Sequence, residues 1–143
     1  MLISTKGRYA LRVMIDLAEH NNGEYIDLKE IASRQEISEK YLESIISLLT
    51  KSDFLIAQRG KGGGYKLTRQ PHQYTVGSIL KLTEDSLSPV SCLNNKPNRC
   101  IRAAECRTLP MWEKLDTLID EFLESYTIAD LTRMDEGSDN YII

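Results

Sequence analysis

Four glycines within five positions, Gly60 and Gly62 to Gly64, constrain the fold of this 143-residue chain more than any other stretch. On either side lies a run in which apolar and polar residues alternate, "LIAQR" at 55–59 and "YKLT" at 65–68. Two short alternating runs around a glycine-rich turn predict a β-hairpin. The stretch is not a phosphate-binding loop, because it lacks the glycine–lysine–serine/threonine ending of that motif and no helix follows it.

Two short amphipathic helices are predicted just before the hairpin. The first, "DLKEIASRQ", begins at Asp27, with Glu30 placed for a capping box. The second, "EKYLESIISLLTK", is capped by Ser38, and Ile37 fills the short turn between them. This pattern alone fits a helix-turn-helix or an ordinary helical hairpin. The hairpin that follows favours a winged helix-turn-helix.

Three more helices are expected outside this motif. One starts at Ser4 or Thr5, one starts at Thr75 or Ser78, and a long one starts at Thr108. The long helix carries an apolar seam with steps of three and four, formed by Trp112, Leu115, Ile119, Phe122 and Tyr126. Such a seam packs against a neighbouring helix, which is either another subunit or a part of the same domain.

The charge of the chain is unevenly distributed. The net charge is −3, but residues 1–74 hold eleven Lys/Arg against nine Asp/Glu, and residues 75–143 hold seven against twelve. A basic region within an acidic chain, such as residues 1–74 here, is compatible with nucleic-acid binding, although most charged runs are only solvated surface. No apolar run approaches the ~20 residues that cross a bilayer. Since the N-terminus does not resemble a signal peptide, we expect a cytoplasmic protein with reduced thiols.

The predicted fold class is therefore mainly α with a small β-hairpin wing, a winged helix-turn-helix domain plus a long C-terminal dimerisation helix. We expect the DNA-binding domain over 1–83, a cysteine-bearing sensor loop over 84–107, the dimerisation helix and a short following helix over 108–134, and a flexible acidic tail over 135–143.

Three motifs, "STKGRYALRVMIDLA", "ISEKYLESIISLL" and "QRGKGGGYKL", resemble the small winged-helix repressors typified by IscR, NsrR and CymR. The resemblance spans roughly residues 1–131 and keeps the spacing between the motifs. It implies a homodimeric transcriptional repressor that binds a palindromic site on double-stranded DNA, and not an enzyme. A thiol oxidoreductase is disfavoured separately, because the chain has no C-x-x-C pair.

The resemblance also implies which residues contact DNA. Ser38 and the helix N-terminus suit a phosphate, and Glu43 suits a cytosine amino group. Arg59 suits a narrow, electronegative minor groove. The alternative is that Tyr41 and Glu43 are ordinary surface residues of the helix and do not contact DNA. The full candidate set is Ser38, Tyr41, Glu43, Arg59, Gly60, Lys61, Gly62 and Gly63.

All three cysteines, Cys92, Cys100 and Cys106, lie in one loop without clear periodicity. In the cluster-binding members of the family that this chain resembles, three cysteines in this loop hold an iron–sulfur cluster. We therefore expect a cluster of the 2Fe–2S type here. Zinc is disfavoured because its sites show a close C-x2–4-C pair. The remaining alternative is three unconnected free thiols.

The fourth cluster ligand stays open. Leu109 stands where one relative has a histidine, and Arg8 stands where another has an aspartate. Neither side chain is an iron–sulfur ligand of the usual kinds. Glu105, a water or a small thiol are the alternatives.

The end of the chain suggests a second hypothesis. "NYII" is similar to the tails with which CymR-type regulators bind cysteine synthase, and it ends on Ile143. A clusterless repressor of cysteine metabolism, controlled by that enzyme through Ile143, is therefore the alternative to a cluster sensor.

Overall fold

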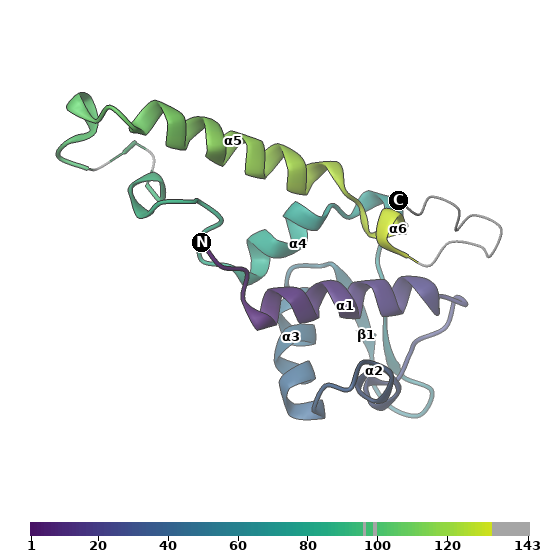
Figure 1. The fold of residues 1–143 in the computed structure, drawn as a ribbon. Coiled ribbons are helices and arrows are strands. Elements are labelled where there is room, and N and C mark those ends of the chain that lie inside the picture. Colours follow the sequence, from purple (N-terminus) through teal and green to yellow (C-terminus); the bar gives the residue numbers. More distant parts are fainter. Residues whose placement is uncertain (96, 99, 133–143) are drawn as a thin grey trace.

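The computed structural model describes residues 1–95, 97–98 and 100–132. It is mainly helical with one antiparallel hairpin, which confirms the predicted fold class (Figure 1). The elements in chain order are α1 (Thr5–Glu19), α2 (Leu28–Gln35), α3 (Glu39–Lys51), β1 (Leu55–Gln58), β2 (Gly64–Leu67), α4 (Val76–Thr83), α5 (Leu109–Ser125) and α6 (Ile128–Leu131). Single 3-10 turns lie at Pro71–Gln73, Ser91–Leu93 and Ala103–Glu105.

The start of α1 is anchored to the end of α4. Ser4 is the N-cap, and its Oγ accepts a hydrogen bond from the Gly7 N–H at 3.0 Å. The backbone N–H and the hydroxyl of Ser4 both donate to the Glu84 carboxylate at 2.7 Å. A cap predicted from local sequence thus also holds together two segments that lie far apart in the chain.

The helix-turn-helix core follows the predicted periodicity. Ser38 caps α3 by accepting from the Tyr41 N–H at 3.2 Å, and Ile37 is buried in the turn. The inner face of α3 packs against the buried side of α1. The buried residues of α3 are Leu42, Ile45, Ile46 and Leu49, as expected.

The predicted capping box at the start of α2 is wrong. Asp27 is the N-cap residue, but its side chain makes no capping hydrogen bond. The Glu30 carboxylate lies 3.4 Å from the Arg34 guanidinium, one turn along the same helix. Glu30 thus has the Arg34 guanidinium as its partner and does not close a capping box.

The wing is a two-stranded hairpin with a further backbone segment bridged to its edge. Leu55 pairs with Leu67, and Gln58 pairs with Gly64. Ile26 exchanges two backbone hydrogen bonds with Tyr65, at 2.9 and 2.8 Å, and so adds a bridge to the edge of β2.

Tyr74 holds the base of the same hairpin, where β1 begins and β2 ends. It is fully buried, and its hydroxyl donates to the Phe54 carbonyl at 2.9 Å. The same oxygen accepts from the N–H groups of Thr68 and Arg69, at 2.9 and 3.0 Å. A buried hydroxyl that is satisfied in this way gives the wing a rigid base.

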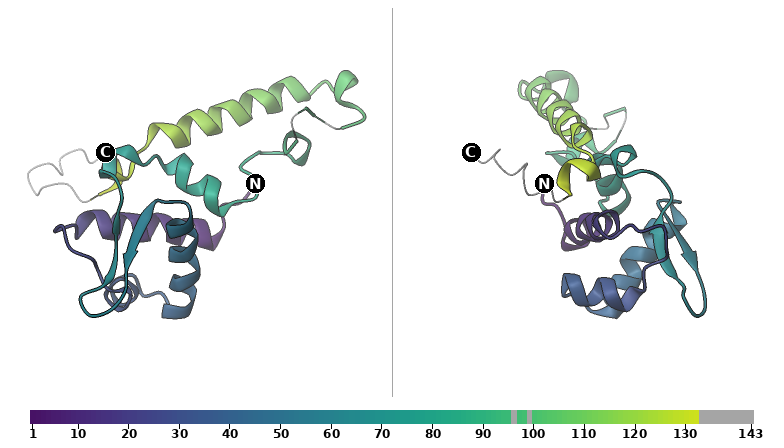
Figure 2. Two further views of the ribbon diagram at one scale, coloured as in Figure 1. Left: turned by 180° about the vertical axis from the view of Figure 1, so that it is seen from behind. Right: turned by 90° about the vertical axis from the view of Figure 1, so that its right-hand side faces the viewer.

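Helix α5 lies on the far side of α4 from α1, opposite α2 and the hairpin (Figures 1 and 2). Lys81 of α4 forms ion pairs with Asp120 and Glu124 of α5, at 2.8 and 3.0 Å. After α5 the chain turns back, and α6 packs on α1 with Ile128 fully buried. In the part of the chain that the structure describes, no helix is long and apolar enough to cross a membrane.

Candidate nucleic-acid interface

The outer side of α3 and the wing enclose one groove. Helix α3 contributes Glu43, Ser47 and Lys51, and the hairpin contributes Arg59 and its glycines. The structure therefore brings four of the predicted DNA-contacting residues, Glu43, Arg59, Gly60 and Gly63, to one surface. Glu43 and Arg59 are both exposed, so their charged ends are free to meet a ligand.

The other four candidates do not line this groove. Lys61 and Gly62 are exposed at the wing tip, beside the loop that contains Gly23. Ser38 is exposed at the N-terminus of α3, where the hydroxyl that caps the helix keeps its proton for donation. Tyr41 is half-buried, and its ring meets Tyr9 of α1 edge-on at a centroid distance of 5.8 Å.

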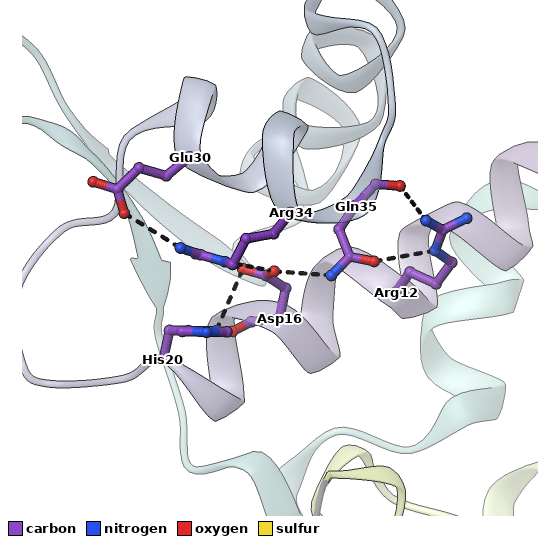
Figure 3. Close-up of polar contacts among 6 residues, drawn as sticks. All are labelled: Arg12, Asp16, His20, Glu30, Arg34 and Gln35. Atoms are coloured by element: carbon purple, nitrogen blue, oxygen red, sulfur yellow. Dashed lines mark hydrogen bonds and ion pairs between the residues drawn. The ribbon is translucent and has the colours of Figure 1, made fainter.

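A polar network between α1 and α2 was not predicted from the sequence (Figure 3). Its centre is Asp16 of α1, whose side chain is 0% exposed. Arg34 donates to the Asp16 carboxylate from Nη2 and Nε, at 2.8 and 3.0 Å, and Gln35 Nε2 donates at 2.9 Å. The available signal was an acid at position 16, three residues after Val13 and next to Leu17 on the apolar face of a predicted helix.

The network changes the electrostatics of Arg34. Hydrogen bonding to Asp16 raises the pKa of the guanidinium, and this effect outweighs the opposing cost of burial. Glu30 adds a smaller contribution in the same direction. Arg34 is therefore a permanent cation whose charge compensates a buried carboxylate.

Arg12 extends the network towards α3. Its Nε donates to Gln35 Oε1 at 3.1 Å, and its Nη2 donates to the Gln35 carbonyl oxygen. The guanidinium carbon lies 4.8 Å from the centre of the Tyr9 ring, within the range of a cation–π contact.

The cysteines lie apart from this surface, in the loop before α5. Cys92 and Cys106 are half-buried and Cys100 is exposed, and all three are free thiols. Among the described residues, no three or more Cys, His, Asp or Glu side chains are grouped so that they could hold a metal ion. In this arrangement the predicted ligands are thus not gathered at one point.

The chemistry of the loop nevertheless fits a thiolate-ligated group. A hydrogen bond with Thr108 lowers the pKa of the Cys106 thiol, and the nearby charge of Arg102 acts in the same direction. Asn98 accepts from the Cys100 N–H at 2.8 Å through Oδ1. Its buried Nδ2 has no hydrogen-bond partner within the described ranges. A thiol with a lowered pKa and an unused donor are features that suit a sulfur cluster.

The positions considered for the fourth ligand are dispersed. Leu109 is the first residue of α5 and is half-buried. Arg8 is exposed on α1 and donates to Thr5 Oγ1 at 3.0 Å. Glu105 lies exposed in the turn before Cys106.

The predicted apolar seam on α5 faces outward over much of its length. No residue of α5, which the structure describes completely, is buried. Leu115 is 37% exposed, Phe122 60% and Tyr126 42%, whereas Trp112 and Ile119 are half-buried. Met111 and Leu118, at 53% and 55% exposed, widen the apolar surface. Exposed apolar area of this extent on a single helix marks an interaction surface.

A helix-turn-helix with a hairpin wing, and with charged side chains along the groove between them, defines a winged-helix DNA-binding fold. Residues 3–134 match the Rrf2 family, which is described as an iron-dependent transcriptional regulator. The chain belongs to this family, and it is a transcriptional regulator, not an enzyme.

Individual relatives agree with this assignment. The chain is 36% identical to the HTH-type transcriptional regulator IscR of Sodalis glossinidius over 136 residues, which cover 95% of this chain and 81% of the relative. It is 35% identical to Protein rrf2 of Nitratidesulfovibrio vulgaris, over 93% of this chain and 88% of the relative.

Two solved structures have a similar fold. CymR of B. subtilis, described as a global cysteine regulator, matches with a TM-score of 0.75 and 35% identity, over 92% of this chain and 95% of that one. The T. potens IscR matches with a TM-score of 0.70 and 35% identity, over 92% and 85%. Both the IscR type and the CymR type named from the sequence motifs are thus among the similar structures.

Proposed function

We propose that this chain is a homodimeric repressor that binds palindromic double-stranded DNA through α3 and the wing. The observation that carries the proposal is the shared groove, in which Glu43 of α3 faces Arg59 and the glycines of the hairpin. A recognition helix needs an exposed face for the major groove, and a wing needs a slim tip that approaches the backbone.

Each side chain has a distinct role in this proposal. Arg59 enters the minor groove from the wing, where the negative potential is strongest. Glu43 accepts from a cytosine amino group, and because it repels phosphate it favours specificity over affinity. Ser38 and the N-terminus of α3 hold a phosphate, which sets the position of the helix along the duplex.

Arg59→Ala tests the DNA-binding proposal. Titrations of a duplex that the wild-type protein has selected from a randomised pool are run over a series of salt concentrations. We expect weaker binding and a salt slope that is smaller by about one contact per subunit. Lys114→Ala, which removes an exposed cation on α5, is the matched control and leaves the slope unchanged. An unaltered slope for Arg59→Ala contradicts the assignment of the wing.

Dimerisation through α5 is part of the same proposal. Helix α5, whose apolar side chains are largely exposed, lies on the opposite side of the molecule from α2 and the hairpin (Figure 2), so a second copy packed on α5 leaves both DNA-binding surfaces free. Palindromic half-sites then lie about one helical turn apart, ~34 Å, or a multiple of it.

We further propose that Cys92, Cys100 and Cys106 hold an iron–sulfur cluster of the 2Fe–2S type in a cytoplasmic protein. Three thiols in one loop, the lowered pKa of Cys106 and the similarity to IscR support this proposal. A bound cluster would supply one-electron redox chemistry at these thiols. The loop must rearrange to bring the three thiols together, and that rearrangement connects the cluster to the start of α5. The regulated genes would be those of iron–sulfur assembly or sulfur supply.

Anaerobic purification tests the cluster directly. The expected product is brown and contains iron and sulfide, and Cys100→Ser, which removes the exposed thiol, loses the colour without unfolding. A protein that stays colourless after careful anaerobic reconstitution refutes the cluster. The proposal of DNA binding does not depend on this result.

The second candidate is a clusterless regulator of cysteine metabolism that is controlled by cysteine synthase. It is favoured by the similarity to CymR and by the terminal "NYII", which lies outside the described residues. Deletion of Ile142 and Ile143 should abolish a complex with purified cysteine synthase. If the truncated chain binds the enzyme as well as the full chain, this candidate is excluded.

A further inference from the structure

The amide of Gln35 lies between two charged side chains (Figure 3). Its Nε2 donates to Asp16 Oδ2 at 2.9 Å, and its Oε1 accepts from Arg12 Nε at 3.1 Å. An amide offers donors on one side and an acceptor on the other, so a carboxylate and a guanidinium on opposite sides select a single orientation. Gln35 is thus held from both ends by charges on α1.

Arg12 also binds the backbone at the end of α2. Gln35 is the last residue of α2, and its carbonyl belongs to the last turn, whose carbonyls lack partners within the helix. Arg12 Nη2 donates to this carbonyl oxygen. The next residue, Glu36, has a left-handed backbone with φ of 55°, and α3 begins three residues later. The position of the Gln35 carbonyl therefore sets the direction in which the chain enters α3.

A second route leads from Arg12 to the recognition helix. The guanidinium lies over the Tyr9 ring at 4.8 Å, and Tyr9 meets Tyr41 with an interplanar angle of 65°. Tyr41 lies in the first turn of α3, and its N–H is the one that Ser38 caps. One guanidinium on α1 thus touches both the entry to α3 and the ring against which Tyr41 rests.

We infer that Arg12 is a positioning residue for DNA recognition, which orients Tyr41 and the first turn of α3 without itself touching DNA. The inference rests on the proposed DNA-binding function. Two of the three guanidinium nitrogens are engaged by Gln35 and the flat face is covered by Tyr9, so Arg12 is held in place before DNA arrives. A pre-organised surface loses less conformational entropy on binding.

The test measures the affinity and the salt slope of DNA binding for the wild type, Arg12→Ala, Arg12→Lys and Lys114→Ala. The probe is the duplex selected by the wild-type protein from a randomised pool. Arg12→Ala should bind about tenfold more weakly, in line with the loss of a charge-assisted contact. Its salt slope should equal that of the wild type, because no phosphate contact is lost.

Arg12→Lys distinguishes geometry from charge. Lysine keeps the positive charge but cannot bond both oxygens of Gln35 and stack on Tyr9 at once. It should therefore stay close to Arg12→Ala in affinity. If Arg12→Lys binds DNA with the affinity of the wild type, the inference is overturned. A salt slope of Arg12→Ala that is smaller than the wild-type slope by about one also overturns it, because it indicates a direct phosphate contact.

Coupling to Tyr41 separates positioning from a general loss of stability. In a Tyr41→Ala background, Arg12→Ala should lower the affinity by clearly less than its about tenfold effect in the wild type, since one of the two features that it positions is gone. A further loss of the full size overturns the inference. If Arg12→Ala does not fold, Tyr9→Leu removes the ring contact and leaves both bonds to Gln35, and it should weaken binding severalfold; binding equal to that of the wild type overturns the inference.

The failure of this inference is distinct from the failure of the proposed function. If the wild type selects no duplex at all, both fall. If Arg59→Ala loses affinity while Arg12→Ala binds as well as Lys114→Ala, only the positioning role of Arg12 falls.

Discussion

Asp16 and Arg34 form a bidentate ion pair between α1 and α2, with Nη2–Oδ1 and Nε–Oδ2 distances of 2.8 and 3.0 Å. The two side chains are unequal in environment: that of Asp16 is 0% exposed, whereas that of Arg34 is 30% exposed. Removing Arg34 and removing Asp16 therefore lower the free energy of unfolding by different amounts, because only the guanidinium can turn to water when its partner is lost.

We expect Arg34→Met to lower the free energy of unfolding by about 3–5 kcal/mol, since it leaves a buried carboxylate without its main counter-charge. Asp16→Asn should cost less, about 1–3 kcal/mol, because it leaves a cation that reaches solvent. Urea unfolding measures both. The control is Glu30→Ala, which removes only the exposed partner of Arg34 and should change stability by less than about 1 kcal/mol. Equal losses for Arg34→Met and Asp16→Asn contradict the asymmetry.

Glu84 should make the stability depend on pH in the acid range. Burial alone would raise the pKa of this carboxyl, but hydrogen bonds from Ser4 and Thr83 hold the pKa below its ordinary value of 4.5. A carboxyl with a depressed folded pKa stabilises the fold above its unfolded pKa, and this contribution is lost as the pH falls through the folded pKa. The difference in unfolding free energy between the wild type and Glu84→Gln should thus be constant at neutral pH and shrink below 4.5.

Unfolding in urea at several pH values between about 6 and 3 measures this effect. Ser4→Ala removes one contribution to the depressed pKa, the hydrogen bond from the Ser4 hydroxyl, and keeps the one from the backbone N–H at position 4. In that background the pH dependence attributed to Glu84 should be weaker. A difference between the wild type and Glu84→Gln that grows on acidification contradicts the direction of the shift.

Gly64→Ala should disrupt the wing. Gly64 has a φ of +145°, and an added Cβ would meet the backbone of Ile26, which cannot move without breaking its bridge to Tyr65. We expect a loss of at least about 1–3 kcal/mol from the backbone strain alone, together with weaker DNA binding. Gly62→Ala is the control, because its φ of +78° is strained but its Cβ would point into open space. If the two variants lose the same stability, the close approach of Ile26 is not the cause.

Phe122→Glu should convert the proposed dimer into a folded monomer. The side chain is 60% exposed in the single chain, so the charge does not disturb the core of the subunit. Sedimentation should report the monomer mass, and circular dichroism should be unchanged. Glu121→Lys, a charge change of two units at the preceding exposed position, should leave the mass of the dimer intact. If the Phe122→Glu protein remains a dimer, α5 does not form the dimer interface.

Much of the winged helix was predictable because its signals are local. Ser38 caps α3 through a bond to a backbone group three residues away, and the inner face from Leu42 to Leu49 follows the helical period. The strands Leu55–Gln58 and Gly64–Leu67 were predictable from the alternation of apolar and polar residues and the glycine-rich turn between them. Each of these features is decided within a few residues, so a single sequence contains enough information.

The failures occurred where local and distant partners compete. Glu30 was expected to cap α2, but it faces Arg34, which is itself held by Asp16 from another helix. The cysteine loop has no period, and nothing in its sequence indicates how near Cys92, Cys100 and Cys106 lie to one another. Its three thiols were recognisable as a set, whereas their spacing in space was not.

Capping groups, helical period and strand alternation thus determined the elements of this protein and the order in which they occur. The tertiary structure decided which polar groups meet. Ser4 reaches Glu84 across 80 positions of the sequence, and Asp16 reaches Arg34 across 18. These pairs satisfy side chains that burial would otherwise leave unpaired, and burial is a property of the whole packed fold and not of any short stretch of the chain.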